Sequence, residues 1–140
     1  MQKTNYIFII FFSIIFSSHA QNYWQKVDDN DVETNSIKES YTNITKHQLF
    51  SLNYSLLKNN LENSPYRHSG EISQVNVDFP VENTFKEFAI YKVKTLDDQL
   101  AQSFPNIQSY VGVSKDKKAN IRITLTNQGF FGMILQGRSA

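Results

Sequence analysis

The chain has 140 residues, of which 40% are hydrophobic and 19% are charged, and it contains no cysteine. A disulfide scaffold and thiol chemistry of every kind are therefore excluded, and the fold has to rely on apolar packing. The 14 basic and 13 acidic side chains give a formal net charge of +1. This balance argues against nucleic acid or an anionic membrane as a partner.

The first 20 residues have the pattern of a cleavable secretory signal. Residues 6–16 form an apolar run that is interrupted by one serine, and small residues follow up to Ala20. The run is shorter than the about 20 apolar residues of a transmembrane helix, and no stop-transfer pattern follows, which argues against an uncleaved anchor. We expect cleavage between Ala20 and Gln21 and a secreted protein, periplasmic or extracellular, that has no membrane contact once the signal is removed.

Residues 21–44 are polar and acidic, and they show neither a helical nor a strand period. We interpret them as an extended arm in front of one domain, residues 45–140. Trp24 either anchors this arm on the domain or belongs to a mobile terminus. Asp29, Asp31 and Glu33 have the spacing of a calcium loop, but the loop's required glycine and its final glutamate are missing. We therefore assign no metal to the arm.

The first predicted helix runs from Thr45 to Leu61. Thr45 and Gln48 have the spacing of a capping box. Leucines follow at helical spacing, at positions 49, 52, 56, 57 and 61. Pro65 and the polar residues before it mark the end of the helix. We expect this longer helix to pack its leucines into the core.

A hairpin is predicted next. Val75, Val77 and Phe79 alternate with polar residues, which is the period of a strand with one solvated face. Residues 80–84 form a turn, and residues 85–93 alternate again. The second strand is expected to pair antiparallel with the first.

A short helix and three strands complete the chain. Thr95 and Asp98 resemble a second capping box, and Pro105 stops the short helix after Phe104. Strands are predicted over residues 107–113, 120–126 and 130–135. Residues 127–129, Asn-Gln-Gly, supply a tight turn between the last two.

This order of elements predicts an α+β fold, with an antiparallel sheet of about five strands and one longer and one short helix packed on one face. The strand order cannot be read from the pattern. Residues 130–135 are apolar on both faces, so we expect this strand to be central or covered by something beyond the domain. Its candidate contacts with a partner are Phe130, Phe131, Met133 and Leu135.

The sequence carries no recognisable catalytic group. His47 and His68 lack further ligands at metal-site spacing, and no serine lies in a G-x-S-x-G elbow. Asp97 and Asp98 are better explained as charges at a helix start than as an acid and base pair. We expect no catalytic residue, no metal and no cofactor in this chain.

An ordered set of short patches resembles the N-terminal pro-region of secreted bacterial reprolysin-like (M12B-type) zinc metalloproteases. The likeness covers about residues 48–139. The patches are Leu52–Leu61 with Ser64–Pro65, Val75–Pro80, Phe85–Ile90, Leu100–Ile107, Ile121–Thr126 with Gly129–Phe130, and Gly137–Ser139.

This resemblance implies a non-catalytic domain that helps a secreted zinc metalloprotease to fold and keeps it latent until removal. The protease domain would be the partner, in cis or in trans. Its H-E-x-x-H-x-x-G-x-x-H motif does not occur in this chain, so zinc is expected only in the protease domain. The chain is expected to be a fragment truncated before that domain. A freestanding exported binding or adhesion module is the alternative, and an enzyme in its own right is a third reading.

Overall fold

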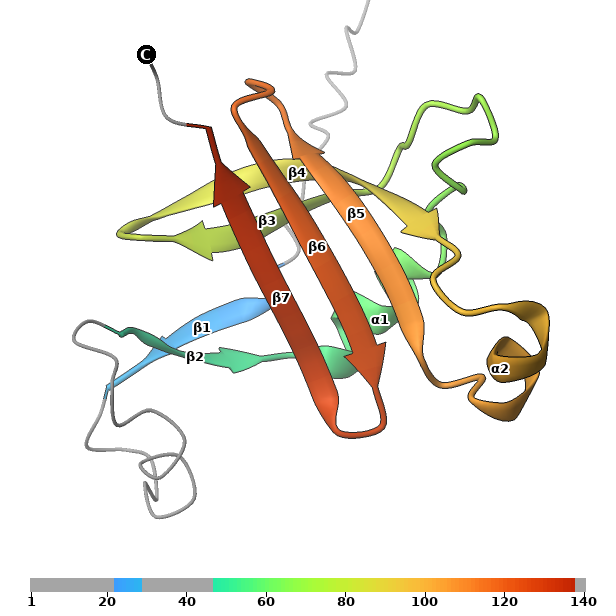
Figure 1. Ribbon diagram of the computed structural model, residues 1–140. Coiled ribbons are helices and arrows are strands. Elements are labelled where there is room, and N and C mark those ends of the chain that lie inside the picture. The colour runs from blue at the N-terminus through green and yellow to red at the C-terminus, as the bar shows by residue number, and fades with distance from the viewer. Residues whose placement is uncertain (1–21, 29–46, 138–140) are drawn as a thin grey trace, which may run out of the picture.

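The computed structural model describes residues 22–28 and 47–137 and shows two antiparallel sheets with two short helices (Figure 1). The smaller sheet pairs β1 (Trp24–Val27) with β2 (Leu49–Leu52). The larger sheet follows the chain order: β3 (Asn76–Val81), β4 (Thr84–Val93), β5 (Gln108–Ser114), β6 (Ala119–Thr126) and β7 (Gly129–Gln136). The helices are α1 (Tyr54–Leu61) and α2 (Asp98–Ser103).

The predicted α+β class is wrong, because the described part of the chain is mostly β. The helices have only 8 and 6 residues, whereas the sheets have two and five strands. Of the two described helices, α1 alone packs into the core, through Leu57 and Leu61. No residue of α2 is buried, so the expectation of two helices packed on one face of the sheet is also wrong.

The predicted helix from Thr45 to Leu61 is the main source of this error. Residues 49–52 form β2 instead, and they pair with β1 from Trp24↔Leu52 to Val27↔Leu49. The helix starts after Asn53, whose side chain accepts a hydrogen bond from Leu56 N (3.1 Å) and so caps it. Thr45 lies outside the described residues. The Gln48 side chain donates to Asn83 Oδ1 (2.7 Å) rather than capping a helix.

The predicted strands of the larger sheet are confirmed, but the turn predicted over residues 80–84 is shorter, because β3 runs to Val81 and β4 begins at Thr84. The hairpin pairs β3 with β4, with Val77 opposite Phe88 and Val81 opposite Thr84. The turn before β7 ends at Gly129, whose φ of +130° is a conformation that other residues rarely adopt. The strands of the larger sheet, which are neighbours in chain order, therefore follow two local signals, the alternation of apolar and polar residues and the residue types at the turns.

The core lies on the inner face of the five-stranded sheet, which α1 and the smaller sheet cover from behind in the view of Figure 1. Its largest fully buried side chains include Phe79, Phe88, Ile90, Tyr110 and Ile121. Phe79 packs edge-on against Phe88 at 5.9 Å between ring centroids. The Tyr54 hydroxyl donates to Thr126 O (3.0 Å), which ties α1 to the end of β6.

The segment expected to be an arm without secondary structure contains β1, and Trp24 does anchor it on the domain. The Trp24 indole Nε1 donates to Asp78 O (2.8 Å). Its ring lies 5.7 Å from Phe79 and 5.5 Å from Phe130, measured between centroids. Buried aromatic area and one satisfied donor hold β1 in place, although β1 itself has only 4 residues.

The second helix starts later than predicted. Asp97 is its N-cap and accepts a hydrogen bond from Leu100 N (2.9 Å). The Thr95 hydroxyl is instead paired with the Ser109 hydroxyl. The helix ends at Ser103, with Phe104 as its C-cap, so the predicted stop before Pro105 is confirmed.

Candidate functional site

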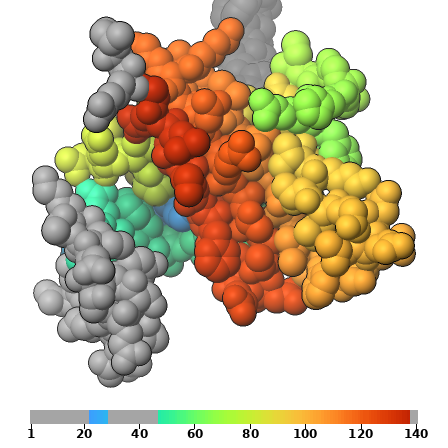
Figure 2. Space-filling model, in the orientation of Figure 1, coloured from blue at the N-terminus to red at the C-terminus, as the bar shows by residue number. Residues whose placement is uncertain are grey.

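The surface with the strongest features of a binding site is the side of β5, β6 and β7 that points away from the core, here called the outer face. Alternation along each strand places Val111, Arg122 and Met133 side by side across the three strands. The next rows are Val113, Asn120 and Leu135, and Ser109, Thr124 and Phe131. Figure 2 shows this side of the sheet, with β5 to β7 in orange and red facing the viewer.

Three large apolar side chains of β7 are solvent-exposed on the outer face. Phe131 is 57% exposed, Met133 is 60% exposed and Leu135 is 51% exposed. Val111 and Val113 of β5 lie half-buried on the same face, separated from them by the polar outward residues of β6, which are Asn120, Arg122 and Thr124. None of the described elements covers the row Phe131, Met133 and Leu135, and an exposed apolar row bordered by polar residues is typical of a surface that contacts another molecule.

Phe130, the fourth predicted contact, points the other way. Its ring lies 6.0 Å from the ring of Phe79 in a stacked arrangement and 5.5 Å from that of Trp24. It also covers Gly132, where an added Cβ would come within 2.7 Å of the ring. The structure therefore brings Phe131, Met133 and Leu135 together and assigns Phe130 to the packing of the inner face.

Of the two alternatives for the last strand, the central position is wrong, because β7 is an edge of the five-stranded sheet, and cover by something beyond the domain stays a prediction. Among the described strands it pairs with β6 alone, from Thr126↔Gly129 to Ala119↔Gln136. Its inner side rests on the core through Phe130 and Ile134, and its outer side is open. The strand β7 is apolar on both sides because one side packs on the core and the other is an exposed apolar surface.

Arg122 is the one functional candidate on this face that sequence reasoning missed. It is the only charged residue in β5, β6 and β7, and it is exposed between Val111 and Met133. Its side chain makes no ion pair with another described residue. The sequence does show Arg122 as a single charged residue between the apolar residues Ile121 and Ile123, which places it on the solvated side of a predicted strand. Its apolar neighbours across the sheet come from strands whose pairing was not predicted.

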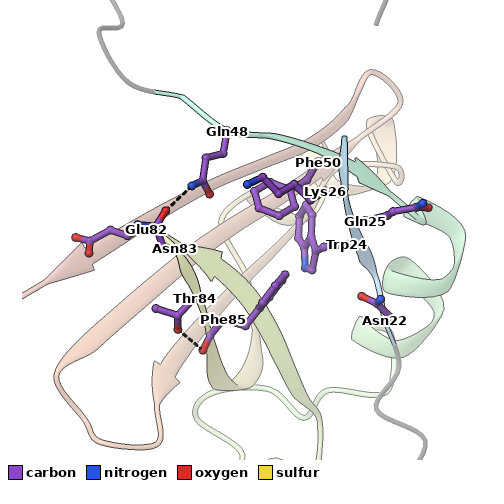
Figure 3. Close-up of a pocket in the computed structure, with 10 residues that line it drawn as sticks. All are labelled: Asn22, Trp24, Gln25, Lys26, Gln48, Phe50, Glu82, Asn83, Thr84 and Phe85. Carbon is purple, nitrogen blue, oxygen red and sulfur yellow. Dashed lines mark hydrogen bonds between the residues drawn. The ribbon is translucent and has the colours of Figure 1, made fainter. Parts of the chain in front are cut away.

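A separate surface pocket of about 330 Å³ lies between the smaller sheet and the tip of the β3–β4 hairpin (Figure 3). The rings of Phe50 and Phe85 meet edge-on across it at 6.0 Å. Its lining mixes aromatic and amide groups with one lysine and one glutamate, and it holds no histidine. The pocket is built from elements other than β5 to β7, so it is not part of the outer face.

Two titratable groups within residues 22–28 and 47–137 have markedly shifted pKa values, and neither lies on the outer face. Burial raises the pKa of Tyr110 to about 12, and its hydroxyl donates to Gln108 Oε1 (2.9 Å). Hydrogen bonds from the Ser114 hydroxyl and the Lys118 backbone N–H lower the pKa of Asp116 to about 2. The first shift reflects core packing and the second a hairpin turn, so neither group is poised for proton transfer near neutral pH.

Among the described residues, no group of three or more His, Asp or Glu side chains is arranged to hold a metal ion. His47 and His68 are exposed and come from different loops. Ala20 and Gln21, together with Asp29, Asp31 and Glu33, lie outside the described residues. Within residues 22–28 and 47–137, no helix is long and apolar enough to cross a membrane.

Comparison of the chain with protein-family models, with curated proteins and with solved structures finds no match. The function therefore has to be argued from the outer face and from the sequence pattern.

Proposed function

We propose that this chain is a secreted, non-catalytic pro-region that binds the protease domain of a zinc metalloprotease, helps it to fold and keeps it latent. The observation that carries the proposal is the outer face, where Phe131, Met133 and Leu135 are each more than half exposed. A sheet face of this kind suits a folded protein partner, since burying it removes apolar surface from water. The resemblance described above supplies the class of partner.

Latency would follow from binding alone. A domain that binds the folded protease and not the unfolded chain stabilises the folded form by mass action. The same domain, seated over the active-site cleft, would exclude substrate until it is cut away. Arg122 lies at the centre of the face, so a carboxylate on the protease surface is the charge that would complement it.

The cognate protease domain is to be identified by reading the coding DNA beyond the codon for Ala140. An in-frame continuation into H-E-x-x-H-x-x-G-x-x-H provides the partner for the binding test. If the DNA holds no such motif nearby, the pro-region proposal is wrong, and the alternative of a freestanding exported binding or adhesion module replaces it.

The binding test compares Phe131→Asp with Ile72→Asp. Ile72 is 80% exposed and lies in the loop before β3, so it receives the same charge away from the outer face. We expect Phe131→Asp to weaken binding and inhibition of the protease domain about tenfold or more, because it removes apolar contact area and adds a carboxylate that can pair with the diagonal neighbour Arg122 in place of the protease. Ile72→Asp should bind like the unmodified chain. Binding is measured by calorimetry and latency by peptide hydrolysis.

Both variants are expected to unfold in urea at the midpoint of the unmodified chain, because both side chains are exposed. Equal binding by the two variants would show that the outer face is not the contact surface. Unfolding of Phe131→Asp alone would instead assign Phe131 a structural role.

A further inference from the structure

The two edges of the five-stranded sheet differ in how well they are protected against pairing with another strand. At one edge, β3 carries Asp78 and Pro80, and Asp78 O already accepts the indole N–H of Trp24. Charge, proline and an occupied carbonyl are common ways of blocking an edge. At the other edge, the 8 residues of β7 read GFFGMILQ and include neither a charge nor a proline. Of the two edges of the five-stranded sheet, as the described residues show them, only the β7 edge is therefore open to another strand.

The hydrogen-bonding groups of this open edge can be assigned from the ladder. Gly137 N donates to Lys118 O (3.0 Å), in line with the β6–β7 register. Because pairing alternates along an antiparallel ladder, residues 129, 131, 133 and 135 bond to β6. The N–H and C=O groups of residues 130, 132, 134 and 136 then point to the free edge. No other described backbone group pairs with them.

We propose that β7 is a self-association edge, at which a second copy of the chain pairs its own β7 antiparallel about a two-fold axis at Met133. This register aligns the free N–H and C=O groups of residue 132 with those of residue 134 of the second copy. On the outer face it places Phe131 against the second copy's Leu135 and Met133 against Met133. All three exposed apolar side chains gain an apolar neighbour.

A second copy fits this edge better than a strand of unspecified sequence for two reasons. An uncharged strand meets no like-charge repulsion when it pairs with itself. In the proposed register, Gly132 lies opposite Ile134 on the inner side, so a position without a side chain faces a branched one. The neighbouring symmetric register, centred on Gly132, would leave Leu135 opposite Gly129. The axis is therefore assigned to Met133.

The two outer faces would lie on the same side of the joined sheet, since paired residues point to the same side of a ladder. This inference does not depend on the protease partner. The two copies join through the backbone edge of β7, and Phe131, Met133 and Leu135 contact the second copy sideways, which leaves the outward surface of the joined sheet accessible. Pairing through one strand is a small interface, and we therefore expect an association that depends on concentration.

The absence of cysteine allows a test by single-cysteine variants of the chain from Gln21 onward. Met133 is a non-hydrogen-bonded pair at the proposed axis, where side chains approach closely enough for a disulfide. Under mild oxidation we expect Met133→Cys to form cross-linked dimers about tenfold faster than Ile72→Cys or Leu135→Cys alone. A mixture of Phe131→Cys and Leu135→Cys should form mainly the mixed dimer. Products are followed on non-reducing gels.

Sedimentation equilibrium supplies the second readout. The unmodified chain should show a mass that rises with concentration, and Met133→Lys should stay monomeric, because two ammonium groups would face each other at the axis. Ile72→Lys is the matched control and should associate like the unmodified chain. Equal cross-linking of all single-cysteine variants, or a mixed dimer of Phe131→Cys with Met133→Cys, would overturn the assigned register. A monomeric unmodified chain at every concentration would overturn self-association itself.

Discussion

Phe130 and Phe131 are neighbours of the same type with opposite roles. Phe130 lies between Trp24 and Phe79 on the inner face, and Phe131 is 57% exposed on the outer face. The cause is the two-residue period of a strand, which sends successive side chains to opposite sides. Predicting partner contacts from hydrophobicity alone therefore groups Phe130, which packs in the core, with Phe131, which lies on the surface.

Gly112 shows how close packing constrains a single position in the core. It lies on the inner face of β5, between Ile90 of β4 and Ile121 of β6. A Cβ at this position would come within 2.6 Å of side-chain atoms of both isoleucines and 3.2 Å from Phe88 Cβ. Both isoleucines are almost fully buried, so an added Cβ has to displace closely packed side chains.

We expect Gly112→Ala to destabilise the domain by about 1–3 kcal/mol, the usual cost of overpacking a core. Urea unfolding followed by tryptophan fluorescence measures the change. Gly137→Ala is the control, since the nearest atom to its added Cβ is 3.8 Å away, an ordinary contact. If both variants unfold at the same midpoint, the contacts around Gly112 do not limit the core.

At the scale of the element, the turn between β5 and β6 is organised by one carboxylate. Asp116 accepts hydrogen bonds from the Ser114 hydroxyl (2.5 Å), the Lys118 backbone N–H (3.0 Å) and Lys86 Nζ (3.3 Å). These donors lower its pKa from 3.8 to about 2. Because the pKa is lower in the folded state, the ionised carboxylate favours folding.

The contribution of Asp116 is fully present above its ordinary pKa of 3.8 and is lost as the pH falls toward about 2. We therefore expect Asp116→Asn to unfold at a lower urea concentration than the unmodified chain at pH 6. The gap between the two midpoints should close between pH 3.8 and pH 2. Urea unfolding curves of Asp116→Asn and of the unmodified chain, recorded at several pH values across this range, test the expectation. A gap that is the same at pH 6 and pH 2 would show that ionisation of Asp116 is irrelevant to the turn.

Residues 49–61 show why the length of α1 was overestimated. Leucines at positions 49, 52, 56, 57 and 61 fit a helical period, but the first two belong to β2. The partner of β2 is β1, which is distant in the chain, and Asn53 then caps a helix of 8 residues. Local periodicity cannot reveal such a partner, because pairing is decided by packing in three dimensions.

At the scale of the whole molecule, the domain is closed on one side of its main sheet and open on the other. The smaller sheet and α1 complete the core on the inner side, and the apolar row of β7 stays exposed on the outer side. This asymmetry is the physical basis of both proposals. The outer face suits a folded partner, and the open edge suits a second copy.

Export, which the sequence predicts, is tested on the whole chain. When the full 140-residue chain is expressed in a secreting bacterium, we expect the released protein to begin at Gln21, as determined by intact mass. Ala20→Lys should leave the precursor 20 residues longer, because signal cleavage requires a small residue there. Gln25→Lys should be processed normally. A released protein that retains residues 1–20, or a chain that stays in the cytoplasm, would contradict the signal assignment.

The sequence by itself determined the strands of the main sheet, the end of α2 before Pro105 and the turn at Gly129, because alternation, proline and glycine act through the local backbone. It also named the three exposed large apolar residues of β7, but together with Phe130, which faces the core. Only the tertiary structure decided that β1 pairs with β2, that β7 is an edge and that Phe130 faces the core. These features depend on contacts such as Trp24 with Phe79, between residues far apart in the chain, and no local pattern encodes them.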